Sequence, residues 1–215
     1  MVDFDSQQNL SMSLLSDERL EALPSLYDSI KSGAPMPVTN ISQGLDLVPA
    51  VVELARAEID LSTRIAREQL LRNMLQPLMG KYDYILIDCP PALGLLTINA
   101  LTAADELLLP LTGEALPLRG LVMLEGIVRE VAAHINPRLH VGGVVITRYN
   151  NRKLNRSIID SIRARYGNRV FSTLIRENIQ LAEAPLMHSC IYDYAPDSNG
   201  AADYLALARE LLSRT

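Results

Sequence analysis

Two short apolar runs in this sequence each end at an aspartate, and they limit the possible folds more than any other feature. Residues 1–5 read Met-Val-Asp-Phe-Asp, and residues 84–91 read Tyr-Ile-Leu-Ile-Asp-Cys-Pro-Pro. In an open parallel sheet, the carboxyl ends of the strands line the crevice in which ligands bind. Two carboxylates at such an edge suit a magnesium–phosphate site, because Mg²⁺ prefers oxygen ligands and bridges nucleotide phosphates.

Strand-like runs alternate with helix-like patterns along the chain. We predict strands at residues 1–5, 45–49, 84–88, 106–110, 141–147 and 170–175. We predict helices at residues 23–31, 95–103, 118–133 and 152–166, a helical region that begins near residue 51, and a last helix capped by Ser198 or Asn199. This alternation indicates βαβ units, and hence an α/β fold with a mostly parallel sheet flanked by helices. The length of 215 residues is that of a single domain, 1–215.

Two of the predicted helices carry an apolar face at helical spacing. The first face consists of Ile65, Leu71, Met74, Leu75 and Leu78, and Gly80 ends that helix. The second face, in the last helix, consists of Leu205, Ala208 and Leu212.

Composition and charge restrict the class of protein. Hydrophobic residues make up 48% and charged residues 21% of the chain, as in ordinary globular proteins. The net charge of −5 argues against a wholly basic nucleic-acid binder, but it is compatible with a local basic face. Cys89 and Cys190 show no metal-ligand spacing. Because two cysteines make a disulfide scaffold unlikely, a reducing cytoplasm is expected. We expect no signal peptide and no membrane span, since the N-terminus is acidic and no apolar run reaches the roughly 18 residues required.

Several stretches, in the right order, resemble the ParA/Soj family of partition ATPases, part of the wider group of P-loop NTPases that includes MinD. Residues 2–11, Val-Asp-Phe-Asp-Ser-Gln-Gln-Asn-Leu-Ser, are similar to the family's D-x-D-P-Q-x-N-x-[ST] segment after its second strand. Residues 82–101 resemble its Walker B and switch II stretch. Residues 178–185 and 198–201 resemble its C-terminal signature. The resemblance implies a P-loop NTPase-like fold, with ATP and Mg²⁺ as cofactors.

The resemblance assigns roles to three aspartates. Asp5 would be the catalytic residue that orients the attacking water, since phosphoryl transfer depends mainly on positioning and charge stabilisation. Asp88 would hold Mg²⁺ through water, and Asp3 would support that network. Taken without the resemblance, Asp3 and Asp5 could equally be ordinary turn carboxylates.

The resemblance also implies further contacts with the nucleotide. Pro90, the proline after it and Gly94 would form a switch that senses the γ-phosphate, because the prolines restrict the backbone and the glycine frees it. Arg148, Asn178 and Pro185 lie where the family holds the adenine base.

The family's phosphate-binding loop, K-G-G-x-G-K-[ST], occurs nowhere in these 215 residues. In the family's order, this loop and the first strand precede Met1, and that strand is central in the sheet. We therefore expect an N-terminally truncated ParA-like nucleotide-binding domain that binds ATP poorly. A start codon assigned too late and a true relative without the loop are both compatible with the sequence.

The leading hypothesis for function is an ATP-gated homodimer for plasmid, chromosome or mobile-element partitioning. It would be cytoplasmic and nucleoid-associated, and it would bind non-specific DNA and a ParB-like partner. The basic residues between 148 and 169 are Arg148, Arg152, Lys153, Arg156, Arg163, Arg165 and Arg169, against the acid Asp160. Arg152, Lys153 and Arg156 are thus candidate DNA contacts, although a solvated helix face explains them equally well.

Other features favour different functions. Many relatives are basic where this chain has Glu177 and Gln180, and near Asp197 and Asn199, so DNA binding would be weaker here or moved to the 148–169 face. The missing loop favours a non-catalytic interaction protein. A MinD-like membrane-associated ATPase is disfavoured, because residues 205–215 mix acids and bases and end on a polar tail. Glu114 is interpreted as a structural or dimer-interface residue.

Overall fold

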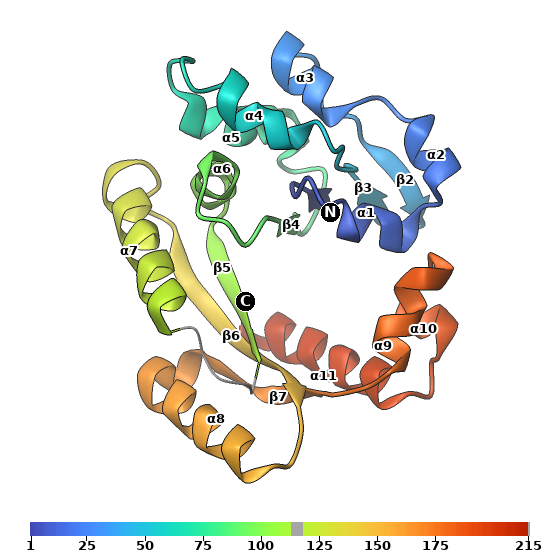
Figure 1. Ribbon diagram of the computed structural model, residues 1–215, viewed down its shortest axis with the longest axis vertical. Coiled ribbons are helices and arrows are strands. Elements are labelled where there is room, and N and C mark those ends of the chain that lie inside the picture. The colour runs from blue at the N-terminus through green and yellow to red at the C-terminus, as the bar shows by residue number, and fades with distance from the viewer. Residues whose placement is uncertain (113–117, 215) are drawn as a thin grey trace. The chain divides into compact units, whose positions relative to one another are not determined.

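The computed structural model describes residues 1–112 and 118–214, and it divides into two compact units (Figure 1). Unit 1 comprises Met1–Asp105 and Gly126–Leu139, and unit 2 comprises Glu106–Glu125 and His140–Thr215. Helix α7 (Leu118–His134) contributes to both units. Glu114 lies outside the described residues. The α/β prediction is confirmed, since parallel strands flanked by helices occur in each unit.

Unit 1 is built around a short buried strand at the start of the chain. Its elements are β1 (Val2–Asp3), α1 (Asn9–Leu14), α2 (Asp17–Glu21), α3 (Leu26–Ser32), β2 (Thr39–Ser42), β3 (Leu45–Leu47), α4 (Leu54–Asp60), η1 (Arg67–Gln69), α5 (Leu70–Leu75), η2 (Gln76–Leu78), β4 (Ile87–Asp88) and α6 (Leu95–Ala103). β1 pairs with β4 in parallel, and Val2 bridges to Val48 on the other side of β1. β1 is therefore hydrogen-bonded along both edges.

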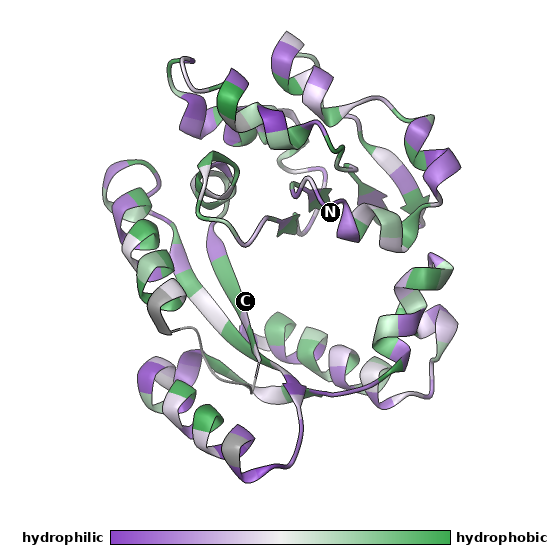
Figure 2. Cartoon of the chain, in the orientation of Figure 1, coloured by the Kyte–Doolittle hydropathy of each residue, from purple (hydrophilic) through white to green (hydrophobic). Residues whose placement is uncertain are grey.

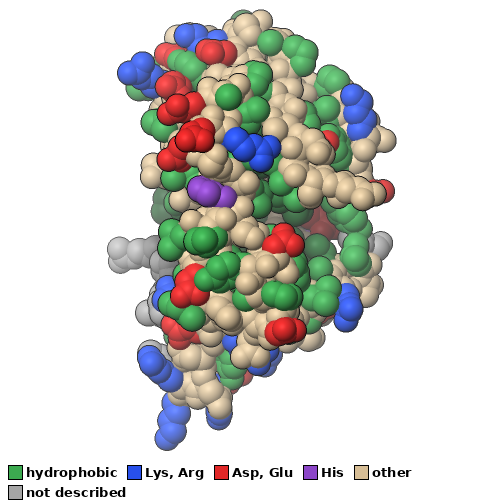
Figure 3. Space-filling view, turned by 90° about the vertical axis from the view of Figure 1, so that its right-hand side faces the viewer, with side chains coloured by type: hydrophobic (Ala, Val, Ile, Leu, Met, Phe, Trp, Pro, Cys, Tyr) green, Lys and Arg blue, Asp and Glu red, His purple; other side chains and the backbone are tan. Residues whose placement is uncertain are grey.

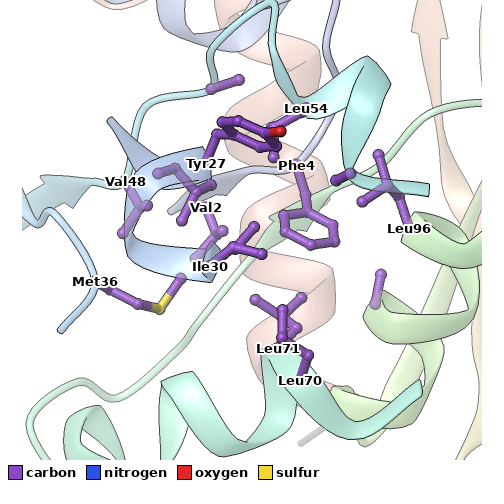
Figure 4. Close-up of a cluster of buried hydrophobic side chains, with 14 of the residues drawn as sticks. Val2, Phe4, Tyr27, Ile30, Met36, Val48, Leu54, Leu70, Leu71 and Leu96 are labelled. Atoms are coloured by element: carbon purple, nitrogen blue, oxygen red, sulfur yellow. The ribbon is translucent and has the colours of Figure 1, made fainter. Parts of the chain in front are cut away.

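The core of unit 1 forms around Phe4, which is fully buried. In Figure 4, Val2 and Phe4 point into a cluster with Ile30, Leu54 and Leu71, drawn from the helices of this unit. Burying side chains of this size stabilises a fold by roughly 1.5–3 kcal/mol each. The apolar residues of the first run therefore anchor its backbone, and with it the position of the aspartates that alternate with them.

Unit 2 is a three-layer sandwich around a parallel sheet. Its elements are β5 (Glu106–Thr112), the first part of α7, β6 (His140–Tyr149), α8 (Lys153–Tyr166), η3 (Gly167–Arg169), β7 (Val170–Arg176), α9 (Gln180–Glu183), η4 (Ala184–Met187), α10 (Ile191–Tyr194) and α11 (Asn199–Arg214). The sheet order is β5-β6-β7. Val144 and Ile146 pack against α8, whereas Val145 packs toward Leu207 of α11. This alternation follows from the two-residue period of a strand and gives the sheet two covered faces.

Two sequence predictions in unit 1 are partly wrong. The predicted strand 84–88 is confined to Ile87–Asp88, while Tyr84 and Leu86 are half exposed. The apolar helix face predicted to start at Ile65 is also wrong at its first residue, because the Ile65 side chain is 95% exposed. The backbone turns at the next residue, Ala66, which has a left-handed φ of 56° that interrupts any helix. The predicted stops at Gly33 and Gly80 are confirmed, with φ of 74° and 82°.

The last helix, α11, is oriented differently from the prediction. Leu205 and Leu212 are 42% and 57% exposed, so the face predicted from their spacing is not the buried one. Leu207 and Leu211 pack against Phe171 and its neighbours instead. The predicted cap is confirmed, because the Ser198 hydroxyl accepts a hydrogen bond from the Ala201 N–H at 3.0 Å.

Glu210 fastens α11 to β7. Its carboxylate accepts hydrogen bonds from the Ser172 and Thr173 N–H groups at 2.8 and 2.9 Å, from the Thr173 hydroxyl at 2.8 Å and from Arg214 at 2.7 Å. Burial alone would raise the pKa of Glu210, but these donors outweigh it and hold the pKa at about 2. The ionised carboxylate is therefore part of the folded structure.

We predict that this carboxylate makes unit 2 acid-sensitive. Because the folded pKa lies below the ordinary value of 4.5, the stabilisation is full above pH 4.5 and is lost as the pH falls toward 2. Glu210→Gln should lower the free energy of unfolding at pH 7 by on the order of 2 kcal/mol and should flatten its pH dependence in that window. Urea unfolding at several pH values measures both effects. Asp160→Asn, at an exposed acid of α8, is the control, and an equal effect of the two substitutions would refute the assignment.

A candidate magnesium and nucleotide site

The register of β1 and β4 brings the two aspartate-ended runs together. Asp3 lies opposite Asp88 in this parallel pair, and the Phe4 N–H donates to the Asp88 carbonyl oxygen at 2.8 Å. Asp5 follows at the carboxyl end of the same run. The strand ends therefore present their acidic residues at one edge, where parallel sheets bind ligands.

Asp3 holds the loop after β1 rather than facing solvent. Its carboxylate is fully buried; Oδ2 accepts from the Ser11 N–H at 2.8 Å and the Ser11 hydroxyl at 2.7 Å, and Oδ1 accepts from the Asp5 N–H at 3.2 Å. The Ser11 oxygen in turn accepts from the Ala50 N–H at 2.9 Å. Burial raises the pKa of Asp3, while the hydrogen bonds from Ser11 oppose that shift. Sequence reasoning missed the role of Ser11, although the serine or threonine at the matching position of the family segment was a signal for it.

Asp5 keeps one carboxylate oxygen available. Oδ1 accepts from the Gln7 N–H at 3.0 Å, whereas Oδ2 makes no hydrogen bond with the described residues. The turn around it is fixed by Gln8, which has a left-handed φ of 58° and whose side chain donates to the Ala50 carbonyl at 2.8 Å. A carboxylate on a loop held by these hydrogen bonds, with one available oxygen, can accept a hydrogen bond from water.

Asp88 sits in a negative field. Neighbouring atoms partly desolvate its carboxyl group, and repulsion from Asp3 and Asp5 adds to this, so its pKa is raised. A divalent cation would relieve both effects, and a carboxylate supplies the oxygen ligand that Mg²⁺ prefers. In the described part of the chain, no three acidic, histidine or cysteine side chains are arranged to hold a metal by themselves. The residues present therefore fit an ion for which Asp88 would supply one of the oxygen ligands.

The predicted switch residues form a loop that is tied back to α6. The Thr97 hydroxyl lies 3.1 Å from the Pro90 carbonyl oxygen and 2.5 Å from that of Ala92. Gly94 caps α6 with an extended backbone, φ −99° and ψ −169°, which any residue can adopt. In this conformation the loop does not require a glycine at residue 94. Thr97, whose role sequence reasoning missed, holds the loop against α6 through its hydroxyl group.

The residues predicted near the adenine base belong to unit 2. Arg148 lies near the end of β6 with a left-handed φ of 51°, and Asn178 follows β7. The Glu177 N–H donates to the Tyr149 carbonyl at 3.0 Å, which joins these two strand ends. The Asn178 side chain accepts from the Gln180 N–H at 2.7 Å and so starts α9, and Pro185 lies in η4. Unit 2 thus gathers Arg148 and Asn178 at neighbouring strand ends, while the three aspartates belong to unit 1.

We predict that Ser11 is needed to hold the loop after β1, on which Asp5 lies, in its observed conformation. Ser11→Ala leaves a buried carboxylate oxygen of Asp3 and the Ala50 N–H each short of a partner, which should lower the free energy of unfolding by about 1–3 kcal/mol. Ser13→Ala is the matched control, since within the described part of the chain the Ser13 hydroxyl bonds only to the Asn9 carbonyl of its own helix, at an exposed position. Urea unfolding measures both variants. Equal stability of the two would show that the Asp3 network does not hold the loop.

Comparisons with known proteins identify the family. A family described as an AAA domain matches residues 1–141. The sporulation initiation inhibitor protein Soj of Bacillus subtilis is 39% identical over 216 residues, which cover 98% of this chain and 85% of Soj. The chromosome partitioning protein ParA of Caulobacter vibrioides is 37% identical over 220 residues, covering all of this chain and 82% of ParA. An uncharacterised protein of Mycobacterium tuberculosis is 42% identical over 173 residues, and the chain spans 54% of its length.

Solved structures agree with this assignment. Cobyrinic acid a,c-diamide synthase from Mycobacterium smegmatis, solved with bound ADP and magnesium, is 32% identical with a TM-score of 0.82, covering 98% of this chain and 80% of that protein. The apo form of McdA from Cyanothece has a TM-score of 0.82 at 22% identity, covering 98% of this chain and 86% of McdA, and shows the shared fold. From the matched family, the Soj and ParA relatives and the aspartates at the strand ends, we conclude that this chain belongs to the ParA/Soj family of AAA-domain ATPases.

Proposed function

We propose that this protein is a ParA-like ATPase for plasmid, chromosome or mobile-element partitioning. The observation that carries the proposal is the register of Asp3 with Asp88, with Asp5 on the same loop, in a chain of the ParA/Soj family. The proposal includes an ATP-gated homodimer, non-specific DNA, a ParB-like partner and a cytoplasmic, nucleoid-associated location. No helix in the described residues is long and apolar enough to cross a membrane.

Each aspartate would have a separate task. Asp88 would hold Mg²⁺, which when bound neutralises phosphate charge and orients the phosphates. Asp5 would use its available oxygen to accept a hydrogen bond from the attacking water. Asp3 would keep Asp5 in place through its hydrogen bonds to the loop. The loop of Pro90 and Gly94 would respond to the γ-phosphate.

Contacts to the base and to DNA would come from unit 2. Arg148, Asn178 and Pro185 would hold the adenine. For DNA, Arg152 and Lys153 stand at the N-terminus of α8, with Arg156 one turn later and no acid in the first turn. Cations at this helix end oppose the helix dipole and add to its positive potential, which favours phosphate. Figure 2 shows the connection into α8 as a hydrophilic stretch.

We predict that Asp5 and Asp88 have separable effects on nucleotide turnover. In the protein as its native cell produces it, Asp5→Asn should retain MgATP binding and lower hydrolysis about 100-fold or more, because water is no longer oriented. Asp88→Asn should weaken Mg²⁺-dependent ATP binding. Nucleotide binding by fluorescence and phosphate release measure the two effects.

Asp83→Asn, at an exposed aspartate before β4, is the matched control. If the wild-type protein neither binds nor hydrolyses MgATP, the ATPase proposal is wrong. The second candidate, a non-catalytic interaction protein, would then stand; it is favoured by the lack of a K-G-G-x-G-K-[ST] loop in these residues.

We predict that the α8 cations contribute to DNA binding. Changing Arg152, Lys153 and Arg156 together to Ala should weaken binding to any DNA duplex and should reduce the slope of log affinity against log salt by about 2–3, since up to three phosphate contacts are lost. Fluorescence anisotropy with ATP and Mg²⁺ over a salt series measures this. The control replaces the exposed Arg19, Arg72 and Lys81 of unit 1. An unchanged slope in the α8 variant would exclude this face.

A further inference from the structure

Unit 1 contains a groove that is separate from the aspartates at the strand ends. It lies where α6, η1 and the end of α7 meet, and its volume of about 370 Å³ is within the range of small-ligand pockets. Four branched aliphatic side chains line it: Ile98 of α6, Ile127 and Val131 of α7, and Ile135, which follows α7. We call this hollow the α6–α7 groove. None of the described residues that line it belongs to the candidate magnesium and nucleotide site.

Two buried asparagines hold the walls of the α6–α7 groove in place. The Asn99 side chain donates to the Arg67 carbonyl at 2.9 Å and accepts from the Leu71 N–H at 3.1 Å, which ties α6 to η1 and α5. Asn136 donates to the Leu101 carbonyl at 3.1 Å, which ties the residues after α7 to the end of α6. Figure 1 shows α6 between α5 and the end of α7. Because a buried amide that loses its partners is costly, these hydrogen bonds keep the groove preformed.

The apolar side chains of the α6–α7 groove differ from those exposed on open surface. On the face drawn in Figure 3, hydrophobic side chains are interspersed with polar and charged ones. Apolar side chains exposed singly are normal on protein surfaces and require no ligand. Ile98, Ile127 and Ile135, in contrast, are partly buried and line one hollow, so one ligand can cover all three.

The α6–α7 groove also carries acidic side chains, Glu68 of η1 and Glu130 of α7, and no lysine or arginine is among its described lining residues. The Glu68 backbone N–H lowers the pKa of this carboxyl, partial burial opposes that shift and Arg67 adds to it, so Glu68 is ionised at neutral pH. Arg67 pairs with Glu68 at 3.0 Å and offsets part of its charge. Glu130 lies 3.6 Å from His134, which is a charge pair only while the imidazole is protonated. The groove therefore attracts cations and repels phosphates.

We propose that the α6–α7 groove binds a linear aliphatic diamine. Its methylene chain would cover the isoleucines of the groove, and its two ammonium groups would pair with Glu68 and Glu130. Two charged ends are favoured because the two acids stand on different elements, η1 and α7, and Ile98 stands on α6 between them. A hydrated inorganic cation would gain nothing from the aliphatic side chains, whereas a hydrocarbon chain buries them. The inference goes beyond the proposed ATPase function, because it assigns a ligand to a second site and does not depend on nucleotide.

The test titrates the full chain, labelled at its isoleucine methyl groups, with a series of α,ω-diamines of about four to eight carbons. Methyl NMR spectra are recorded at constant pH and ionic strength, without nucleotide. The signals of Ile98, Ile127 and Ile135 report on the groove, and those of Ile162 and Ile175, which are buried in unit 2, serve as references. Two ligand controls keep the chain length: the α,ω-diol has no charge, and the n-alkyl monoamine has one.

The protein variants are Glu68→Gln and Glu130→Gln, each made singly. Their matched control is Glu18→Gln with Glu21→Gln, at exposed acids of α2 in the same unit. Thermal unfolding checks that each variant stays folded. The comparison of diamine, monoamine and diol uses the wild-type chain, so it tests the proposal independently of the variants.

We expect the diamine of best-fitting length to shift the three groove signals saturably and to leave the reference signals in place. Each single variant should weaken diamine binding about twofold to fivefold, as expected for exposed ion pairs, with the control unchanged. On the wild type, the monoamine should bind about twofold or more weakly than the diamine, and the diol more weakly still.

Equal binding of the diol or the monoamine would overturn the proposal, since two charges would then not be recognised. So would an unchanged diamine affinity in both single variants, or shifts spread evenly over groove and reference signals, which indicate a non-specific cation effect. Changes of the groove signals with protein concentration in the absence of amine would assign the groove to a second copy of the chain and would also overturn it.

Discussion

The parallel pairing of β1 with β4 is the interaction on which the candidate site depends. Phe4 and Val2 are buried in the core of unit 1, and the alternation of a strand then directs Asp3 and Asp5 away from the Phe4 side. The backbone hydrogen bond from Phe4 to Asp88 sets the register. Burial of the apolar side chains thus holds the three carboxylates close together, although their mutual electrostatic repulsion favours separation.

That arrangement has an electrostatic cost, and the structure reduces it in two ways. Asp3 is surrounded by donors from Ser11 and the Asp5 N–H, so its burial is compensated by hydrogen bonds. Asp88 remains exposed, and its raised pKa reflects partial desolvation and repulsion from the other two aspartates. A bound cation would remove this repulsion. The same repulsion that destabilises the strand ends would therefore favour a divalent ion bound there.

Unit 2 separates its charges instead of concentrating one sign. The 148–169 segment is strongly basic, while residues 177–208 carry acids and no lysine or arginine. Two carboxylates of α11 accept hydrogen bonds from backbone N–H groups of β7 and so hold the helix against the strand. They belong to Asp203, in this acidic part, and to Glu210, just beyond it. Of the other acids in this part, Glu183 accepts a hydrogen bond from the Tyr194 hydroxyl at 3.1 Å and Asp193 lies 2.9 Å from the Cys190 Sγ.

Much of the fold and part of the site followed from the sequence. The order of strands and helices, the glycine stops, the Ser198 cap and the acidic strand ends are local properties, set by side-chain period and backbone sterics within a few residues. The apolar spacing of Ile65 and Leu212 was misleading, because periodicity states which residues share a face but not which face is covered. Ser11 escaped notice because its hydroxyl gains its role from Ala50, 39 residues away, and Thr97 because the path of the loop before α6 brings two carbonyl oxygens to it.

By itself, the sequence determined the family and marked candidate residues for Mg²⁺ and nucleotide, because motif spacing along the chain is enough to specify a family segment. Only the tertiary structure decided which residues each of these side chains contacts. It placed Asp3 opposite Asp88, used Ser11 to join Asp3 to Ala50, and left Leu186 and Met187 exposed. Those outcomes depend on contacts between residues far apart in the chain, and hydrophobic burial selects among them once the whole unit has packed.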